Sequence, residues 1–265
     1  MDTKHNLLNV LRLQNSDKVI SVRQKGVADA SFVLTYLLKH VFTNPKDSVC
    51  LLLTHNIITH YQNVGKRLDF DLLAKLQQGN TRVISLIEKL ADHIGNAESL
   101  KAFRKIVVRE LFDEIQSKIR DLPKDGQVYV VIDDLTHLLD LGSPYKEVLV
   151  FLNSCVNLED VTLIIGTHDS TGHGTEAGLS NGFNYMCDVE ISVAPLKTGR
   201  SLDVTGVITI QRMRPEDKNN VEVYHYKALD REVKVFKPGY MWLTCVALQV
   251  ITYLTCCFYV SKIFF

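Results

Sequence analysis

Residues 128–134 read VYVVIDD, an uninterrupted apolar run that closes on the adjacent carboxylates Asp133 and Asp134. A run this short and this apolar is typical of a strand buried on both faces of a parallel sheet. In nucleoside triphosphatases a carboxylate at the end of such a strand, the Walker B segment, holds Mg²⁺ directly or through water. An aspartate that only shapes a turn gives the same pattern, so the rest of the chain must decide between the two.

Strand and helix signals alternate around this run. Short apolar runs predict further buried strands at 18–22, 49–53, 83–87 and 161–165, and the segments between them predict helices at about 29–42, 59–68, 71–78, 98–122 and 144–157. The last helix is expected to have Ser143 as its N-cap and Pro144 at its first position. Later β segments at 189–193, 204–213, 221–226 and 232–236 have hairpin-length links. The order predicts an α/β fold with a mostly parallel central sheet and antiparallel C-terminal strands.

Two segments of this pattern are unusual. The helix at 29–42 is apolar nearly all round, which predicts that a neighbouring layer or subunit covers its outer face. Residues 166–185 hold five glycines, polar residues and two histidines, and predict a long mobile loop.

The phosphate-binding loop that should accompany a Walker B segment is missing. The motif G-x-x-x-x-G-K-[ST] wraps phosphates in backbone N–H groups and brings a lysine to the β- and γ-phosphates. If Ser31 is placed at the hydroxyl position, Ala30 replaces the lysine, Asp29 the glycine before it and Gln24 the leading glycine. An anionic Asp29 would repel a triphosphate, and no lysine is left to offset transition-state charge. We therefore expect no catalytic residues and no cofactor, with Asp29, Ala30 and Ser31 as a vestigial phosphate loop and Asp133 and Asp134 as its Walker B-like partner.

The chain resembles the family of the sixth subunit of Elongator. The similarity runs in order through the segments at 29–32 (DASF), 131–135 (VIDDL), 168–170 (HDS), 178–180 (GLS), 198–199 (TG) and 203–204 (DV), then Gly206, Ile210, Arg212 and the RP pair at 214–215. The similarity covers residues 6–239. We expect residues 1–239 to form one domain. The resemblance implies a RecA-like, P-loop-type ATPase fold that lacks the P-loop.

The resemblance also implies a role and partners. Family members of this kind form a ring of two heterotrimers with Elongator subunits four and five. That ring binds tRNA and is an accessory to the catalytic Elongator subcomplex, which modifies the wobble uridine (U34) of tRNAs. A non-enzymatic subunit in the cytoplasm, with the nucleus as a further location, is expected. Two alternatives remain: a working NTPase with a divergent phosphate loop that uses Lys25 and Asp133, and a RecA-like paralogue in DNA recombination or signalling.

Charge limits where nucleic acid could bind. Thirty Lys and Arg balance thirty Asp and Glu, so no global basic field attracts phosphates and any contact must be local. The candidates are Lys197, Arg200, Arg212 and Arg214. Strand alternation would put Arg212 and Arg214 on one face, although a solvated strand end explains them equally simply.

A metal site is not expected. His168, His173 and Asp169 include metal-ligating types, but no third convergent ligand is visible, and a glycine-containing loop would hold them poorly. The six cysteines form no C-x-x-C pair.

The C-terminal segment departs from the family pattern. Residues 240–261 carry no charge and are long enough to span a bilayer, within a hydrophobic tail of 240–265. Three explanations compete: a membrane anchor, an alternative terminal sequence, or a buried element. We favour the second, because polar residues dilute the span.

Overall fold

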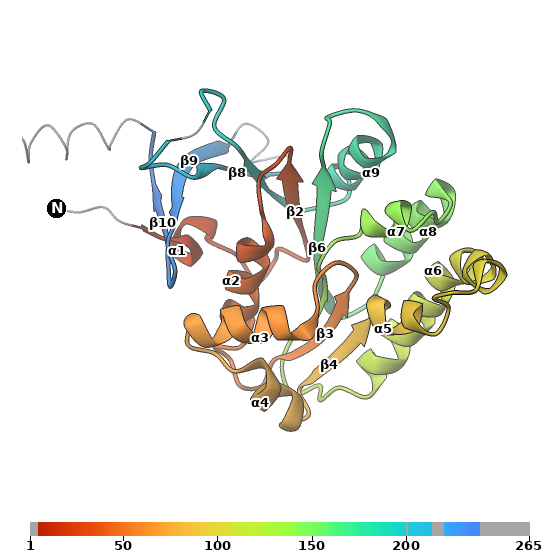
Figure 1. The fold of residues 1–265 in the computed structure, drawn as a ribbon. Helices are drawn as coiled ribbons and strands as arrows, with labels where there is room; N and C mark the ends of the chain where they lie inside the picture. Colours follow the sequence, from red (N-terminus) through yellow and green to blue (C-terminus); the bar gives the residue numbers. More distant parts are fainter. Residues whose placement is uncertain (1–4, 200, 214–219, 239–265) are drawn as a thin grey trace, which may run out of the picture.

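The computed structural model describes residues 5–199, 201–213 and 220–238, and its strands form one ten-stranded sheet (Figure 1). The order across the sheet is β1-β10-β9-β8-β7-β2-β6-β5-β3-β4. The strands are β1 (His5–Asn6), β2 (Val19–Lys25), β3 (Ser48–Leu53), β4 (Thr81–Ser85), β5 (Val128–Ile132), β6 (Val161–Asp169), β7 (Val189–Ala194), β8 (Gly206–Arg212), β9 (Val221–Ala228) and β10 (Val233–Phe236). Strands β2 to β7 pair in parallel, and β8, β9, β10 and β1 extend the sheet antiparallel. The α/β prediction, with a parallel centre and antiparallel C-terminal strands, is confirmed.

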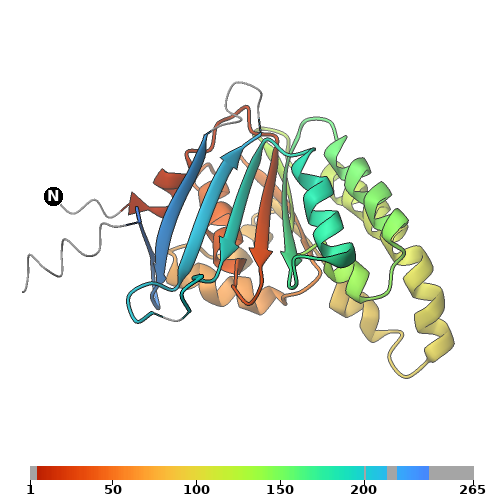
Figure 2. The same cartoon turned by 90° about the horizontal axis from the view of Figure 1, so that it is seen from above.

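Helices cover both faces of the sheet, as Figure 2 shows from above. They are α1 (Leu7–Leu11), α2 (Ser31–Val41), α3 (Ile58–Arg67), α4 (Leu72–Gln77), α5 (Leu86–Ala91), α6 (Ala97–Arg120), α7 (His137–Asp140), α8 (Tyr145–Val156) and α9 (Gly174–Asn184). Two hydrophobic cores result, one under α1 to α4 and one under α5 to α9. Strand β5 serves both, because Val131 enters the first core while Val130 and Ile132 enter the second. Burial on both faces explains why VYVVI is apolar throughout.

The segment at 166–185 is not the predicted loop. Strand β6 continues to Asp169, and α9 begins at Gly174 after a short turn in which Gly172 has φ +76°. Leu179 and Phe183 of α9 are fully buried in the second core. These apolar residues are spaced i, i+4, but the surrounding glycines and polar residues hide the pattern in the sequence.

The helix predicted at 29–42 is α2, and its outer face is covered by this chain itself. Helices α1 and α3 pack against it. The Tyr36 hydroxyl accepts a hydrogen bond from the Val233 N–H at 2.9 Å, which ties α2 to β10. No partner subunit is needed to explain its apolar surface.

Two element boundaries also differ from the prediction. Strand β4 ends at Ser85, because the Ser85 side chain caps α5 by accepting the N–H of Glu88. Helix α8 begins at Tyr145, with Pro144 as its N-cap in an extended conformation instead of at the first helical position.

No helix within the described residues is both long enough and apolar enough to cross a membrane. The hydrophobic tail at 240–265 lies outside the described residues, so its three explanations remain predictions.

Gly166 allows β6 to approach the loop that follows β5. A Cβ at this position would overlap the carbonyl oxygen of Asp133, and the Gly166 carbonyl accepts the N–H of Leu135 at 2.8 Å. We expect Gly166→Ala to lower the free energy of unfolding by about 1–3 kcal/mol, because the backbone must move to admit the methyl group. Urea denaturation of the full chain measures this.

The matched control is Gly182→Ala in α9, where an added Cβ meets no atom within 4 Å. This variant should be neutral or more stable by about 0.5–1 kcal/mol, as expected for alanine in a helix. Equal unfolding midpoints for the two variants would contradict the close approach at Gly166.

Candidate functional site at the carboxyl ends of the parallel strands

The carboxyl ends of β2, β3, β5 and β6 meet at one edge of the sheet, where ligands of open α/β sheets generally bind. A cleft of about 380 Å³ opens there. It is lined by Val22, Gln24, Asp29, Ala30, Ser31, Leu34, His55, Asn56, His60, Asp133, Asp134, His137, Gly166, Thr167 and His168. The structure thus places Asp29, Ala30 and Ser31 in the same cleft as Asp133 and Asp134.

The loop between β2 and α2 uses its own side chains where a phosphate would bind. The Gln24 Oε1 atom accepts the N–H of Ala30 at 3.2 Å, and the Asp29 Oδ1 atom accepts the N–H of Ser31 at 2.8 Å. N–H groups at a helix N-terminus are the usual anion donors. Here a carboxylate of the same chain takes that place, without a lysine beside it.

Asp133 is buried, and its carboxylate accepts several hydrogen bonds from other residues of the chain. Its Oδ1 accepts the Thr54 N–H at 2.6 Å, the Thr54 hydroxyl at 2.7 Å and the Asp134 N–H at 2.8 Å. Its Oδ2 accepts the Asn56 N–H at 2.8 Å, and both oxygens lie within 3.3 Å of the His55 nitrogen. Burial raises the pKa of Asp133, and the hydrogen bonds from Asn56, Thr54 and His55 oppose that rise. Asp133 therefore clamps the loop after β3, and both of its oxygens accept hydrogen bonds from within the chain.

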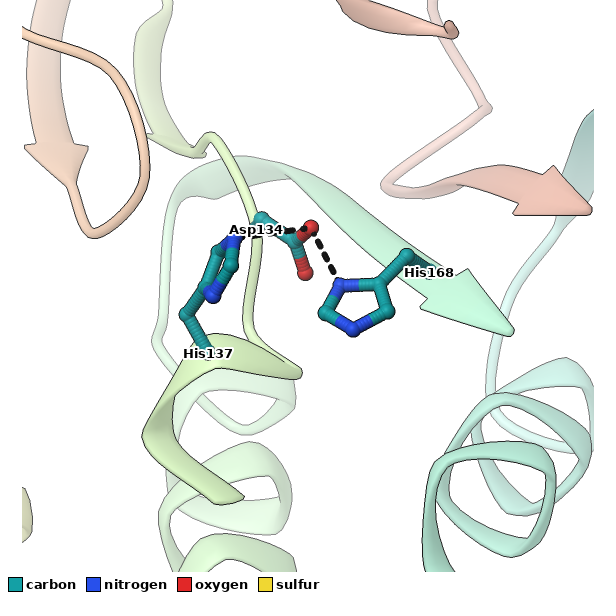
Figure 3. Close-up of side chains that lie close together, drawn as sticks. All are labelled: Asp134, His137 and His168. Carbon is teal, nitrogen blue, oxygen red and sulfur yellow. Dashed lines mark hydrogen bonds and ion pairs between the residues drawn. The ribbon is translucent and has the colours of Figure 1, made fainter. Parts of the chain in front are cut away.

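Asp134 lies beside two histidines that no sequence motif had joined (Figure 3). Its Oδ2 accepts a hydrogen bond from Nδ1 of His168 at 2.7 Å and lies 3.8 Å from Nε2 of His137. Asp140 approaches the same two rings. The hydrogen bond to Asp134 raises the pKa of His168, while burial lowers it. The only advance signal for His137 was its spacing, three residues after Asp134 and three residues before Asp140.

The trio considered from the sequence is not assembled. Alternation along β6 sends Asp169 to the other face from His168, where it pairs with buried Arg23 at 2.5 Å. His173 is the exposed N-cap residue of α9. The argument against a metal, that His168 finds no third ligand, nevertheless fails, because Asp134 and His137 converge on it.

Of the four nucleic-acid candidates, the structure describes Lys197 and Arg212. Lys197 is exposed after β7, whereas the Arg212 side chain is only 11% exposed and pairs with Asp17 at 2.9 Å. Arg212 also donates to the carbonyls of Leu11 and Arg12, so its charge holds the N-terminal segment. Arg200 and Arg214 lie outside the described residues.

The fold and this cleft define a class of protein. A KaiC-like protein from Pyrococcus horikoshii superposes with a TM-score of 0.52 at 10% identity, over 83% of this chain and 90% of that one. The molecule is a RecA-type α/β protein without a phosphate-loop lysine. The family model described as elongation complex protein 6 matches residues 5–230, and the chain belongs to that family.

Individual relatives agree. Elongator complex protein 6 of Drosophila melanogaster is 26% identical over 234 residues, covering 83% of this chain and 90% of its own length. The Danio rerio protein of that name is 25% identical, with 80% and 87% covered, and the Homo sapiens one is 23% identical, with 89% and 96% covered. The similarity therefore extends over nearly the whole of each relative.

The clamp at Asp133 can be tested by Asp133→Asn. The amide NH₂ of asparagine would face backbone N–H donors of the loop after β3, so we expect a loss of roughly 2–3 kcal/mol in the free energy of unfolding. Chemical denaturation followed by far-UV circular dichroism measures it. Asp125→Asn, an exposed position before β5, should change stability by less than about 0.5 kcal/mol. A loss at Asp133 no larger than at Asp125 would refute the clamp.

Proposed function

We propose that this chain is a non-catalytic subunit of the Elongator complex that acts by assembly. It would join subunits four and five in a ring of two heterotrimers, which binds tRNA and supports modification of the wobble uridine (U34) by the catalytic Elongator subcomplex. The family match over residues 5–230 carries the Elongator part of the proposal. A cytoplasmic location, with the nucleus as a further location, is part of the proposal.

The non-catalytic part is supported by one observation: groups that would bind nucleotide or metal in this cleft form hydrogen bonds within the chain. A RecA-type NTPase needs free N–H groups for phosphates, a lysine for their charge and a carboxylate free for Mg²⁺. In this chain Asp29 binds the Ser31 N–H, Ala30 replaces the lysine, and Asp133 is used by the loop after β3. Two parts of the machinery are occupied by contacts within the chain, and the third, the lysine, is absent.

The working-NTPase alternative finds little support in this geometry. Lys25 ends β2, ahead of the turn at Gly26, and Asp133 would have to give up its loop contacts to reach a metal. The DNA-recombination alternative has no support from the family match. The tRNA part of the proposal rests on the family, and Lys197 is the exposed one of the two described candidates, Lys197 and Arg212.

Assembly is the most direct test of the proposal. The full chain is co-expressed with Elongator subunits four and five from the same organism, and the products are separated by size exclusion with light scattering. We expect one species with the mass of six chains, two of each kind. The proposal is wrong if subunits four and five form their ring without this chain, while the chain alone elutes as a folded monomer.

A further inference from the structure

Two imidazoles and two carboxylates converge at the side of the cleft, on residues to which the proposed function gives no role. Asp134 follows β5, His137 and Asp140 lie on α7, and His168 lies near the end of β6. We propose that this His–Asp cluster is a binding site for a divalent transition metal of the zinc type. The ligands are Oδ2 of Asp134, Nε2 of His137 and Nδ1 of His168, with water in the fourth position.

The three side chains bring one ligand atom each close together. They all fall within 4.8 Å of one another. Oδ2 of Asp134 lies 2.7 Å from Nδ1 of His168 and 3.8 Å from Nε2 of His137. Zinc with bonds of about 2.0–2.1 Å holds tetrahedral ligand atoms about 3.3 Å apart, so one distance must lengthen and the other shorten by roughly half an ångström.

Asp140 supplies the outer support that metal-bound histidines usually have. Its Oδ2 lies 2.8 Å from Nδ1 of His137 and 3.5 Å from Nε2 of His168, the ring nitrogens that the proposed ligand set leaves free. A carboxylate on the far nitrogen fixes the tautomer and orientation of a metal-bound imidazole. The His137 ring is further held by stacking on His55, with centroids 4.3 Å apart and planes 7° from parallel.

The donor set selects the kind of metal. Imidazole nitrogen suits zinc and its neighbours, whereas Mg²⁺ and Ca²⁺ prefer oxygen ligands. The side chains of Asp134 and His168 are 13% and 15% exposed, and both line the cleft, which gives a metal an entry path and room for its water. Bound there, the metal would join the β5–α7 loop to the end of β6.

A second grouping, Asp140, His168 and Glu176, competes for the same metal. It is the weaker choice, because Oε2 of Glu176 already accepts the Ser170 hydroxyl at 2.6 Å and the Ser170 N–H at 3.1 Å. Glu176 is therefore tied to its own turn. The two groupings make opposite predictions for His137 and Glu176.

The test is titration of the chelator-treated full chain with Zn²⁺, followed by isothermal calorimetry and by the thermal unfolding midpoint. We expect one Zn²⁺ per chain and a midpoint that rises with Zn²⁺ concentration. Co²⁺ in place of Zn²⁺ should give the intense visible absorption of a tetrahedral site. The affinity should fall by at least tenfold in His137→Gln and in His168→Gln, and by about 10–100-fold in Asp140→Asn, which removes only the outer support.

Two control variants keep the result interpretable. His173→Gln changes an exposed histidine close by, and Glu176→Gln removes the competing carboxylate; both should bind Zn²⁺ as the parent chain does. Circular dichroism verifies that each variant is folded before titration. The proposal is overturned if the folded parent chain binds no Zn²⁺, if the His137 and His168 variants bind it undiminished, or if Glu176→Gln abolishes binding while His137→Gln does not.

Discussion

The buried carboxylate of Asp133 is the contact on which this edge of the molecule depends. It comes from the end of β5, and its acceptor positions are filled by the loop after β3, so neighbouring parallel strands are locked together just where their ends could separate. The Thr54 hydroxyl bridges this carboxylate to the next residue, Asp134. Gly166 lets β6 close on the same point from the other side. An aspartate that in a nucleotide hydrolase would face a metal serves here as an internal cross-link.

The framework around this cross-link rests on two hydrophobic cores. The two hydrophobic cores are built from strands buried on both faces and from helices on either side. A RecA-type framework can therefore lose its phosphate chemistry while keeping its shape. A framework of this kind can act through its surface, as in the assembly role that we propose for this subunit.

The features that were predictable from the sequence are those encoded in short local patterns. The buried run before Asp133, the long helix α6 and the missing lysine at Ala30 are all visible in short windows. Features that need distant partners were not predictable. Arg212 is held by Asp17, 195 residues away, and His168 meets Asp134 and His137 only because β5 and β6 are neighbours. Helix α9 was missed for a local reason, since its glycines mask the spacing of Leu179 and Phe183.

Our proposal of a non-catalytic subunit requires that the cleft at Asp133 does not turn over a nucleotide. Its most direct test is incubation of the full chain with ATP and Mg²⁺, with bound nucleotide measured by calorimetry and released phosphate followed over time. We expect no saturable binding of ATP and no phosphate release above that of the Asp133→Ala variant. Saturable, Mg²⁺-dependent turnover that disappears in Asp133→Ala would contradict the non-catalytic proposal and would show that the chain is a working NTPase.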